Sequence, residues 1–139
     1  MPWEIALKYI AIDLGLKRIG IAYSAHKDIV TPLPAVIRKN RNQASAEVRK
    51  TILEWEADAV VIGVPLGGSS EEEMKRRIAH FMNLVDFQGE VFYQDEAGSS
   101  LEAENMMKGT IKYIRDGRVD SLSAMIILQR FLAKNNFKD

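Results

Sequence analysis

Four acidic side chains occupy positions where a folded chain must pair or neutralise them: Asp13, Asp95, Glu96 and Asp120. Asp13 interrupts an apolar, β-branched stretch, where burial of a carboxylate is unfavourable without a partner. Carboxylates that converge repel one another unless a divalent cation neutralises them, and oxygen ligands suit Mg²⁺ and Mn²⁺. Such a site is typical of phosphodiester hydrolysis, in which metal ions activate a water and stabilise the leaving oxygen.

The residues alone leave structural alternatives open for each of these acids. Asp13 could bond to the backbone of the turn that follows it, or pair with Lys17 or Arg18. Asp95 and Glu96 end a predicted strand, where acids are common. Because neighbouring strand residues face opposite ways, at most one of these two points with Asp13. We therefore expect only one of them to ligate a metal.

Asp120 stands in the first turn of a predicted helix, where an acid can simply cap the helix or complement its dipole. At helical spacing it is followed by Ala124, Ile127 and Phe131, an apolar stripe that should face the sheet. An inward carboxylate at that position would meet the strand ends. The predicted catalytic residues are Asp13, Glu96, Asp95 and Asp120, and the predicted metal ligands are Asp13, Glu96 and Asp120.

The length and composition predict a folded domain and exclude several kinds of site. At about 150 residues per domain, 139 residues predict one domain over 1–139. Cysteine is absent, which excludes disulfides, thiol nucleophiles and cysteine-based zinc sites. Histidine occurs only at His26 and His80, so we expect no metal site built from histidines. No apolar run has membrane-spanning length and no signal-peptide pattern is present, so we expect a cytoplasmic protein without membrane contact.

Basic residues gather around the first predicted hairpin, although 19 Lys and Arg balance 19 Asp and Glu over the whole chain. Near Asp13 these side chains could contact a phosphate backbone, with plain surface charge as the alternative. The predicted nucleic-acid contacts are Lys17, Arg18, Arg38, Lys39 and Arg41. The run Lys75, Arg76 and Arg77 is interpreted as a solvated helix face.

Hydrophobic periodicity predicts an α/β fold with five strands and four helices. The predicted strands cover 9–14, 18–24, 29–37, 58–64 and 90–95, and the helices 43–55, 70–85, 99–108 and 118–133. Pro32 and Pro34 favour an edge position for the third strand, and Ser99 with Glu102 predicts a capping box. This order indicates a mixed sheet, three antiparallel strands and then two parallel ones, flanked by helices.

Four segments carry a family pattern in the expected order. Residues 12–22 match an opening hairpin Asp-x-Gly-x-Lys-Arg-Ile-Gly, and 61–66 match a central strand with a Gly-x-Pro turn. Asp95-Glu96 matches the start of Asp-Glu-Arg-Leu-Thr, and 119–129 match a final helix. In these segments the chain resembles the YqgF/RuvX family of Holliday-junction-resolvase-like, pre-16S rRNA nucleases.

The resemblance implies an RNase H-like fold and a divalent-metal-dependent nuclease that acts on structured nucleic acid, with a role in processing precursor 16S ribosomal RNA. The family's acidic positions fall on the four acids named above. In the leading hypothesis Asp13 bridges Mg²⁺ or Mn²⁺ ions, while Lys17 and Arg18 hold the phosphate backbone. Monomer and homodimer both stay open, because a junction resolvase needs two active sites held together by symmetry.

Two departures from the family pattern lie near the predicted active edge. Residues 97–100 are Ala-Gly-Ser-Ser where the family has Arg-Leu-Thr-Thr, so a basic residue is missing, and the turn after Leu66 is shorter than usual. These departures motivate a second hypothesis, a nucleic-acid-binding or ribosome-assembly protein with little catalysis. A Holliday-junction resolvase and a metal-regulated phospho-acceptor domain complete the set of hypotheses.

Overall fold

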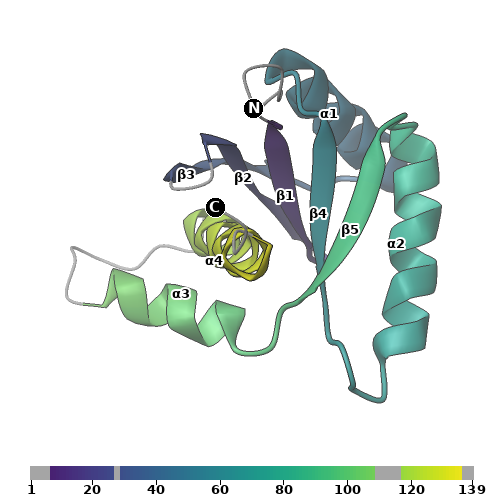
Figure 1. Cartoon of the computed structure of the whole chain (residues 1–139). Coiled ribbons are helices and arrows are strands. Elements are labelled where there is room, and N and C mark those ends of the chain that lie inside the picture. Colours follow the sequence, from purple (N-terminus) through teal and green to yellow (C-terminus); the bar gives the residue numbers. More distant parts are fainter. Residues whose placement is uncertain (1–6, 27–28, 109–116, 136–139) are drawn as a thin grey trace.

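One mixed sheet of five strands forms the centre of the computed structural model, which describes residues 7–26, 29–108 and 117–135 (Figure 1). The strands are β1 (Tyr9–Leu14), β2 (Arg18–His26), β3 (Ile29–Ile37), β4 (Ala59–Val64) and β5 (Glu90–Asp95), in the spatial order β3-β2-β1-β4-β5. β1 pairs antiparallel with β2 and parallel with β4, and β4 pairs parallel with β5. The predicted fold is confirmed, and the two prolines lie in the edge strand β3.

Four helices cover the sheet on both faces. They are α1 (Arg41–Glu54), α2 (Glu71–Val85), α3 (Ser99–Met107) and α4 (Arg118–Lys134). α1 and α2 pack together on one face, and α4 lies across the other face with α3 beside it (Figure 1). α1 begins with a capping box, in which Asn40 Oδ1 accepts from the Gln43 backbone N–H at 2.7 Å. Within the described residues, no helix combines the length and apolar character needed to cross a bilayer.

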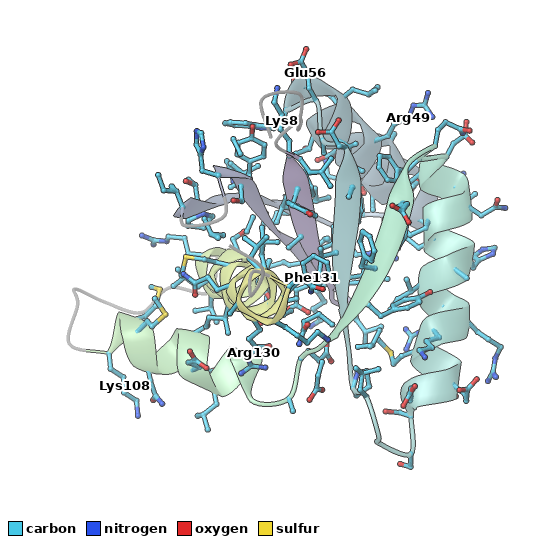
Figure 2. All side chains as sticks on the ribbon, viewed as in Figure 1. Lys8, Arg49, Glu56, Lys108, Arg130 and Phe131 are labelled. Atoms are coloured by element: carbon cyan, nitrogen blue, oxygen red, sulfur yellow. The ribbon has the colours of Figure 1, made fainter. Side chains whose placement is uncertain are left out.

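Strand alternation decides which β1 side chains meet which helices. Ile10 and Ile12 belong to the core under α1 and α2, whereas Ala11 belongs to the core under α4. The predicted apolar stripe of α4 packs into that second core, and Phe131 projects from α4 toward the sheet (Figure 2). By the same alternation Asp13 faces α4.

Gly20 allows α4 to approach the sheet beside Asp13. It is the β2 partner of Asp13 in the antiparallel register, and a Cβ added there would lie 1.9 Å from the Asp120 backbone oxygen. The β2–β3 register shifts nearby, and Ser121 makes two bonds at this place. Its Oγ accepts from the Ile21 N–H at 3.2 Å and donates to the Leu33 carbonyl at 2.6 Å. Helix α4 is therefore joined to β2 and β3 at its first turn.

The close approach at Gly20 predicts a large effect of one methyl group. Gly20→Ala must push the α4 backbone off the sheet, so we expect the free energy of unfolding in urea to fall by about 3 kcal/mol. The matched control is Gly68→Ala, whose new Cβ would lie 3.4 Å from its nearest neighbour and should change stability by less than about 0.5 kcal/mol. Equal stability of the two variants would contradict the close approach.

Candidate active site

Asp13 ends the buried part of β1 and lies half-buried beneath the start of α4. Burial raises the pKa of its carboxyl to about 6, because the charged form loses hydration. That value includes the hydrogen bond from Ser123, which lowers the pKa, and the nearby charge of Asp120, which raises it. Ser123 therefore holds the Asp13 carboxyl in place, but the charged form of Asp13 is still less favourable here than in water.

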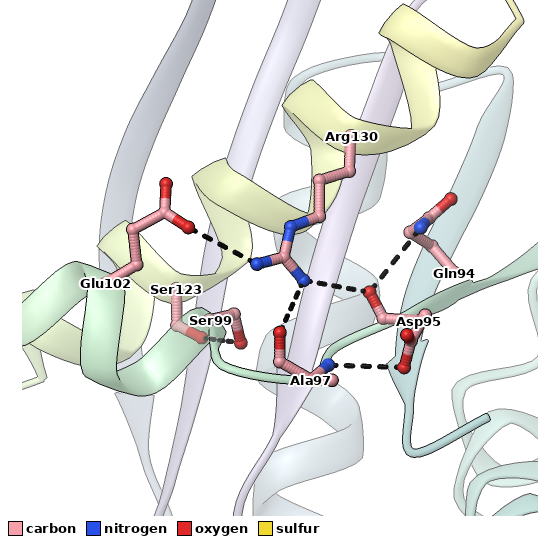
Figure 3. A network of polar contacts seen from close by, with 7 residues as sticks. All are labelled: Gln94, Asp95, Ala97, Ser99, Glu102, Ser123 and Arg130. Carbon is pink, nitrogen blue, oxygen red and sulfur yellow. Dashed lines mark hydrogen bonds and ion pairs between the residues drawn. The ribbon is translucent and has the colours of Figure 1, made fainter. Parts of the chain in front are cut away.

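Ser123 connects Asp13 to a second helix. Its Oγ lies 2.8 Å from Ser99 Oγ, in a buried contact between α4 and α3 (Figure 3). A serine has one hydroxyl proton, so when Ser123 donates to Asp13 the Ser99 hydroxyl is the donor to Ser123. Ser99 was expected to cap α3, but the N-cap is Gly98 and makes no side-chain cap bond. The Ser99 hydroxyl instead supports the orientation of Ser123.

Glu96 is the acid at the end of β5 that shares a face of the sheet with Asp13. Phe92 packs into the core under α4, so Gln94 and Glu96 continue on that face while Asp95 points to the other. Asp95 Oδ1 accepts from the Ala97 N–H at 3.2 Å, as in a tight turn. Burial, together with the charges of Asp13 and Asp95, raises the pKa of Glu96 to about 7.

Gly63 leaves the space that the Glu96 side chain uses. On β4 it lies beside the end of β1, and a Cβ added there would be 3.0 Å from Glu96 Oε1 and 2.5 Å from Ile127 Cδ1. Two glycines therefore flank Asp13 on its neighbouring strands, Gly20 on β2 and Gly63 on β4. Gly20 leaves room for the backbone of α4, and Gly63 leaves room for the Glu96 side chain.

Arg130 holds the turn that carries Glu96. From α4, its Nη1 donates to the Ala97 carbonyl at 2.9 Å and to the Asp95 carbonyl at 3.4 Å (Figure 3). Its Nη2 pairs with Glu102 Oε1 at 3.3 Å on α3. One guanidinium from the second half of α4 thus joins the end of β5 and the start of α3, which fixes the backbone on both sides of Glu96.

Asp120 has a cationic partner of its own. Arg18 Nε donates to Asp120 Oδ2 at 2.8 Å, and both side chains are largely shielded, with 19% and 25% of their surface exposed. The carboxylate is near enough to Asp13 to raise its pKa. Over 7–26, 29–108 and 117–135, however, no three His, Asp or Glu side chains form a group that could hold a metal ion. The structure therefore brings Asp13 and Glu96 together and assigns Asp120 to Arg18.

The other predicted basic residues take separate positions around the hairpin. Arg38 Nη1 donates to the Gly15 carbonyl at 2.7 Å, and Arg41 Nη1 lies 3.3 Å from His80 Nε2. Lys17 and Lys39 are exposed. None of these four lines the cleft of about 410 Å³ that Asp13 and Glu96 share with the β4–α2 and β5–α3 turns.

The donor set fits a divalent cation through two of the three predicted ligands. Asp13 and Glu96 offer hard oxygen donors on one face, at one end of the sheet, in a cleft open to solvent. Burial and mutual repulsion disfavour both ionised forms, and a bound cation would relieve that repulsion. Asp120 completes no three-residue group with them in the described part of the chain, and its Oδ2 is bonded to Arg18.

A family model described as "RuvX: Holliday junction resolvase" matches residues 7–134. The chain belongs to the RuvX family. Three RuvX relatives, each named as a pre-16S rRNA nuclease, match along most of both chains. A Sulfurimonas denitrificans protein is 76% identical over 126 residues, which cover 91% of this chain and 97% of that one. A Campylobacter lari protein is 50% identical over 125 residues (90% and 97%), and a Helicobacter hepaticus protein 41% over 129 residues (88% and 93%).

Solved structures support the fold. RuvC of T. thermophilus in complex with a Holliday junction substrate superposes with a TM-score of 0.59 at 11% identity, covering 94% of this chain and 96% of that one. The fowlpox virus Holliday junction resolvase superposes with a TM-score of 0.54 at 12% identity, covering 92% and 99%. At these identities the likeness concerns the fold alone. The family resemblance and the RNase H-like fold predicted from the sequence are confirmed.

Sequence reasoning missed the residues that position the RuvX acids. Ser123 carries a signal that was available, since it follows Asp120 by three residues on the same helix. Ser99 was assigned to a cap, and Arg130 carried no signal of its own, because its partners are backbone carbonyls distant in sequence. Their roles depend on how α3 and α4 pack.

The raised pKa of Asp13 predicts a pH-dependent gain in stability for Asp13→Asn in chelator-treated buffer. The folded state keeps the Asp13 proton up to about pH 6, whereas an unfolded aspartate loses it near its ordinary pKa of 3.8. Wild-type stability contributed by this group is therefore lost as pH rises from about 4 to about 6. We expect Asp13→Asn to exceed wild type by about 2 kcal/mol at pH 8 and to lose that advantage near pH 4.

Ser123→Ala provides the companion variant for this measurement. Loss of the hydroxyl removes the hydrogen bond that lowers the Asp13 pKa. The loss of stability with rising pH should therefore extend to higher pH in Ser123→Ala than in wild type. Urea midpoints of the three proteins across this pH range supply the data. A constant difference between Asp13→Asn and wild type at every pH would refute the assignment.

Proposed function

We propose that this protein is a nuclease that hydrolyses phosphodiester bonds in structured nucleic acid, with Mg²⁺ or Mn²⁺ held by Asp13 and Glu96. The single observation that carries the proposal is the placement of these two carboxylates on one face of the sheet, in one cleft, with the pKa of each raised. Family membership and the shared name of the RuvX relatives support the reaction class. Precursor 16S ribosomal RNA is the proposed substrate, because those relatives are named for it.

The chain's own residues prepare the site for a phosphodiester. A divalent cation bound there would activate the attacking water and stabilise the charge that develops on the phosphate. Ser123 orients the Asp13 carboxylate, and Arg130 fixes the turn of Glu96. These contacts hold the two oxygen donors at defined positions, which an in-line displacement requires.

Arg18 and Asp120 are proposed to exchange partners when substrate binds. A guanidinium pairs with a phosphate oxygen as well as with a carboxylate, and here it is bonded to Asp120 at 2.8 Å. A backbone phosphate that draws Arg18 away would free Asp120 to complete the cation site. This exchange lets the predicted roles of both residues hold in the substrate complex.

A specific observation favours each of two alternative functions. Ala97 stands where the family pattern has arginine, which favours a nucleic-acid-binding or ribosome-assembly role with little catalysis. The family description and the fold of RuvC favour a four-way junction as substrate. A junction resolvase would require a homodimer with paired sites, whereas processing of precursor rRNA also suits a monomer. With either substrate we propose a cytoplasmic protein.

Cleavage assays with two acid variants test the proposal. Purified protein is incubated with a precursor 16S rRNA fragment and with a four-way DNA junction, in Mg²⁺, in Mn²⁺ and in chelator. We expect wild type to cleave in either metal and not in chelator, and Asp13→Asn and Glu96→Gln to lose about 100-fold or more while still binding substrate.

The matched control is Asp95→Asn, which changes the neighbouring acid; Asp95 also borders the cleft, but its side chain faces the other side of the sheet and bonds the turn at Ala97. Asparagine keeps an oxygen that can accept from the Ala97 N–H, so its activity should stay within about threefold of wild type. Binding without cleavage by wild type in both metals would favour the non-catalytic alternative. Full cleavage by Asp13→Asn would sink the assignment of the site.

A further inference from the structure

A second cleft, of about 500 Å³, opens on the opposite face of the sheet from Asp13. The β1–β2 turn forms one wall, the start of α1 a second, and α2 the third. Its polar lining consists of cationic or imidazole side chains: Arg38, Arg41, Arg76, Arg77 and His80. We call this cleft the arginine groove. Arg76 and Arg77, which the sequence indicated as a solvated helix face, both lie on its α2 wall.

The arginine groove lacks negative charge of its own. No aspartate or glutamate lines it, and within the described ranges none of its four arginines forms an ion pair with a carboxylate. By contrast Arg18, Arg49 and Arg130 each pair with an acid. Unpaired guanidinium groups gathered in a concave surface create a local positive potential, which the balanced net charge of the chain conceals.

Arg38 is preorganised at the base of the groove. Its Nη1 donates to the Gly15 carbonyl at 2.7 Å, and its guanidinium lies 5.5 Å from the centre of the Phe81 ring. Burial lowers the pKa of Arg38, and the positive charges of Arg41 and Arg77 lower it further. The effect of Arg41 and Arg77 on the pKa of Arg38 indicates that the three side chains lie close together. A polyanion could therefore contact all three.

The groove and the acidic cleft share the end of β1. Asp13 and Leu14 are consecutive residues with opposite orientations, so Asp13 lines one cleft and Leu14 the other. Only the turn at Gly15 and Leu16 separates them along the chain, and Leu16 is 75% exposed there. An extended ligand that crosses the end of the sheet could therefore occupy both.

We propose that the arginine groove binds the phosphodiester backbone of the substrate strand that continues past the cleavage site around the end of β1. This inference rests on the proposed nuclease function and adds where the flanking strand runs. Guanidinium forks match phosphate oxygens in geometry as well as charge, and phosphate contacts position a strand without reading its sequence. A single small anion would occupy only part of a groove lined by four arginines, two near the start of α1 and two on α2.

The test compares two double variants with the same loss of charge. Arg76→Gln/Arg77→Gln removes two groove cations from an exposed face of α2, and glutamine is tolerated well in helices. The control, Lys50→Gln/Lys134→Gln, removes two exposed cations that do not line the groove. Anisotropy of a labelled precursor 16S rRNA fragment and of a labelled four-way junction gives Kd as a function of salt, and cleavage assays give kcat and KM.

The groove variant should weaken binding by about tenfold at 100 mM salt and reduce the slope of log K against log salt by about 2, because each arginine removed leaves one phosphate without its cation. KM should rise while kcat stays within about twofold, because the groove holds the flank and not the reacting phosphate. Arg76→Lys/Arg77→Lys should recover the slope and part of the affinity, since lysine keeps charge but not the planar fork.

Each outcome separates this inference from the proposed function. Cleavage by wild type with identical Kd and slope for the groove and control variants would overturn the groove and leave the nuclease intact. Groove-dependent binding without cleavage in any metal would overturn the nuclease and retain the groove as a nucleic-acid site. If millimolar inorganic phosphate displaces the labelled RNA fully from wild type, the groove is a small-anion site and the strand proposal fails.

Discussion

Repulsion between two carboxylates on one face of a sheet is the constraint on which the rest of the site depends. Asp13 lies near the end of β1 and Glu96 directly follows β5. On β4 between them Gly63 has no side chain, and the charge of Asp13 raises the pKa of Glu96 across this gap. Burial raises the pKa of each, and each unit of pKa shift corresponds to about 1.4 kcal/mol against the charged form. A fold that keeps both acids together near neutral pH must be stabilised elsewhere or by a cation.

The packing of α4 on the sheet supplies that stabilisation, and the same helix also contacts the site. Gly20 admits the helix backbone, Ser121 bonds it to two strands, and Ser123 then reaches Asp13. Further along the same helix, Arg130 holds the backbone on both sides of Glu96. A single helix thus buries the apolar core under it and orients both acids, so stability and site geometry are coupled.

The sequence predicted the elements and the acids because both leave local signals. Apolar periodicity located every strand to within about two residues, and Asp13 was conspicuous in an apolar strand. Alternation could already limit Asp95 and Glu96 to one inward residue, but the choice of Glu96 required the register of β5 against β4. The pairing of Asp120 with Arg18 and the grouping of Arg38 with Arg77 could not be predicted, because they join segments far apart in sequence.

Calorimetric titration with Mn²⁺, in buffers of different ionisation enthalpy, tests the central claim most directly. If Asp13 and Glu96 hold the cation, binding at pH 6 must displace the protons they retain, releasing between about one and two protons, and the release must vanish by about pH 8.5. Asp13→Asn and Glu96→Gln should each weaken binding about tenfold or more, while Asp95→Asn, which removes only a neighbouring charge, should stay within about threefold of wild type. Equal Mn²⁺ affinity in all four proteins, or binding at pH 6 without proton release, would contradict the account.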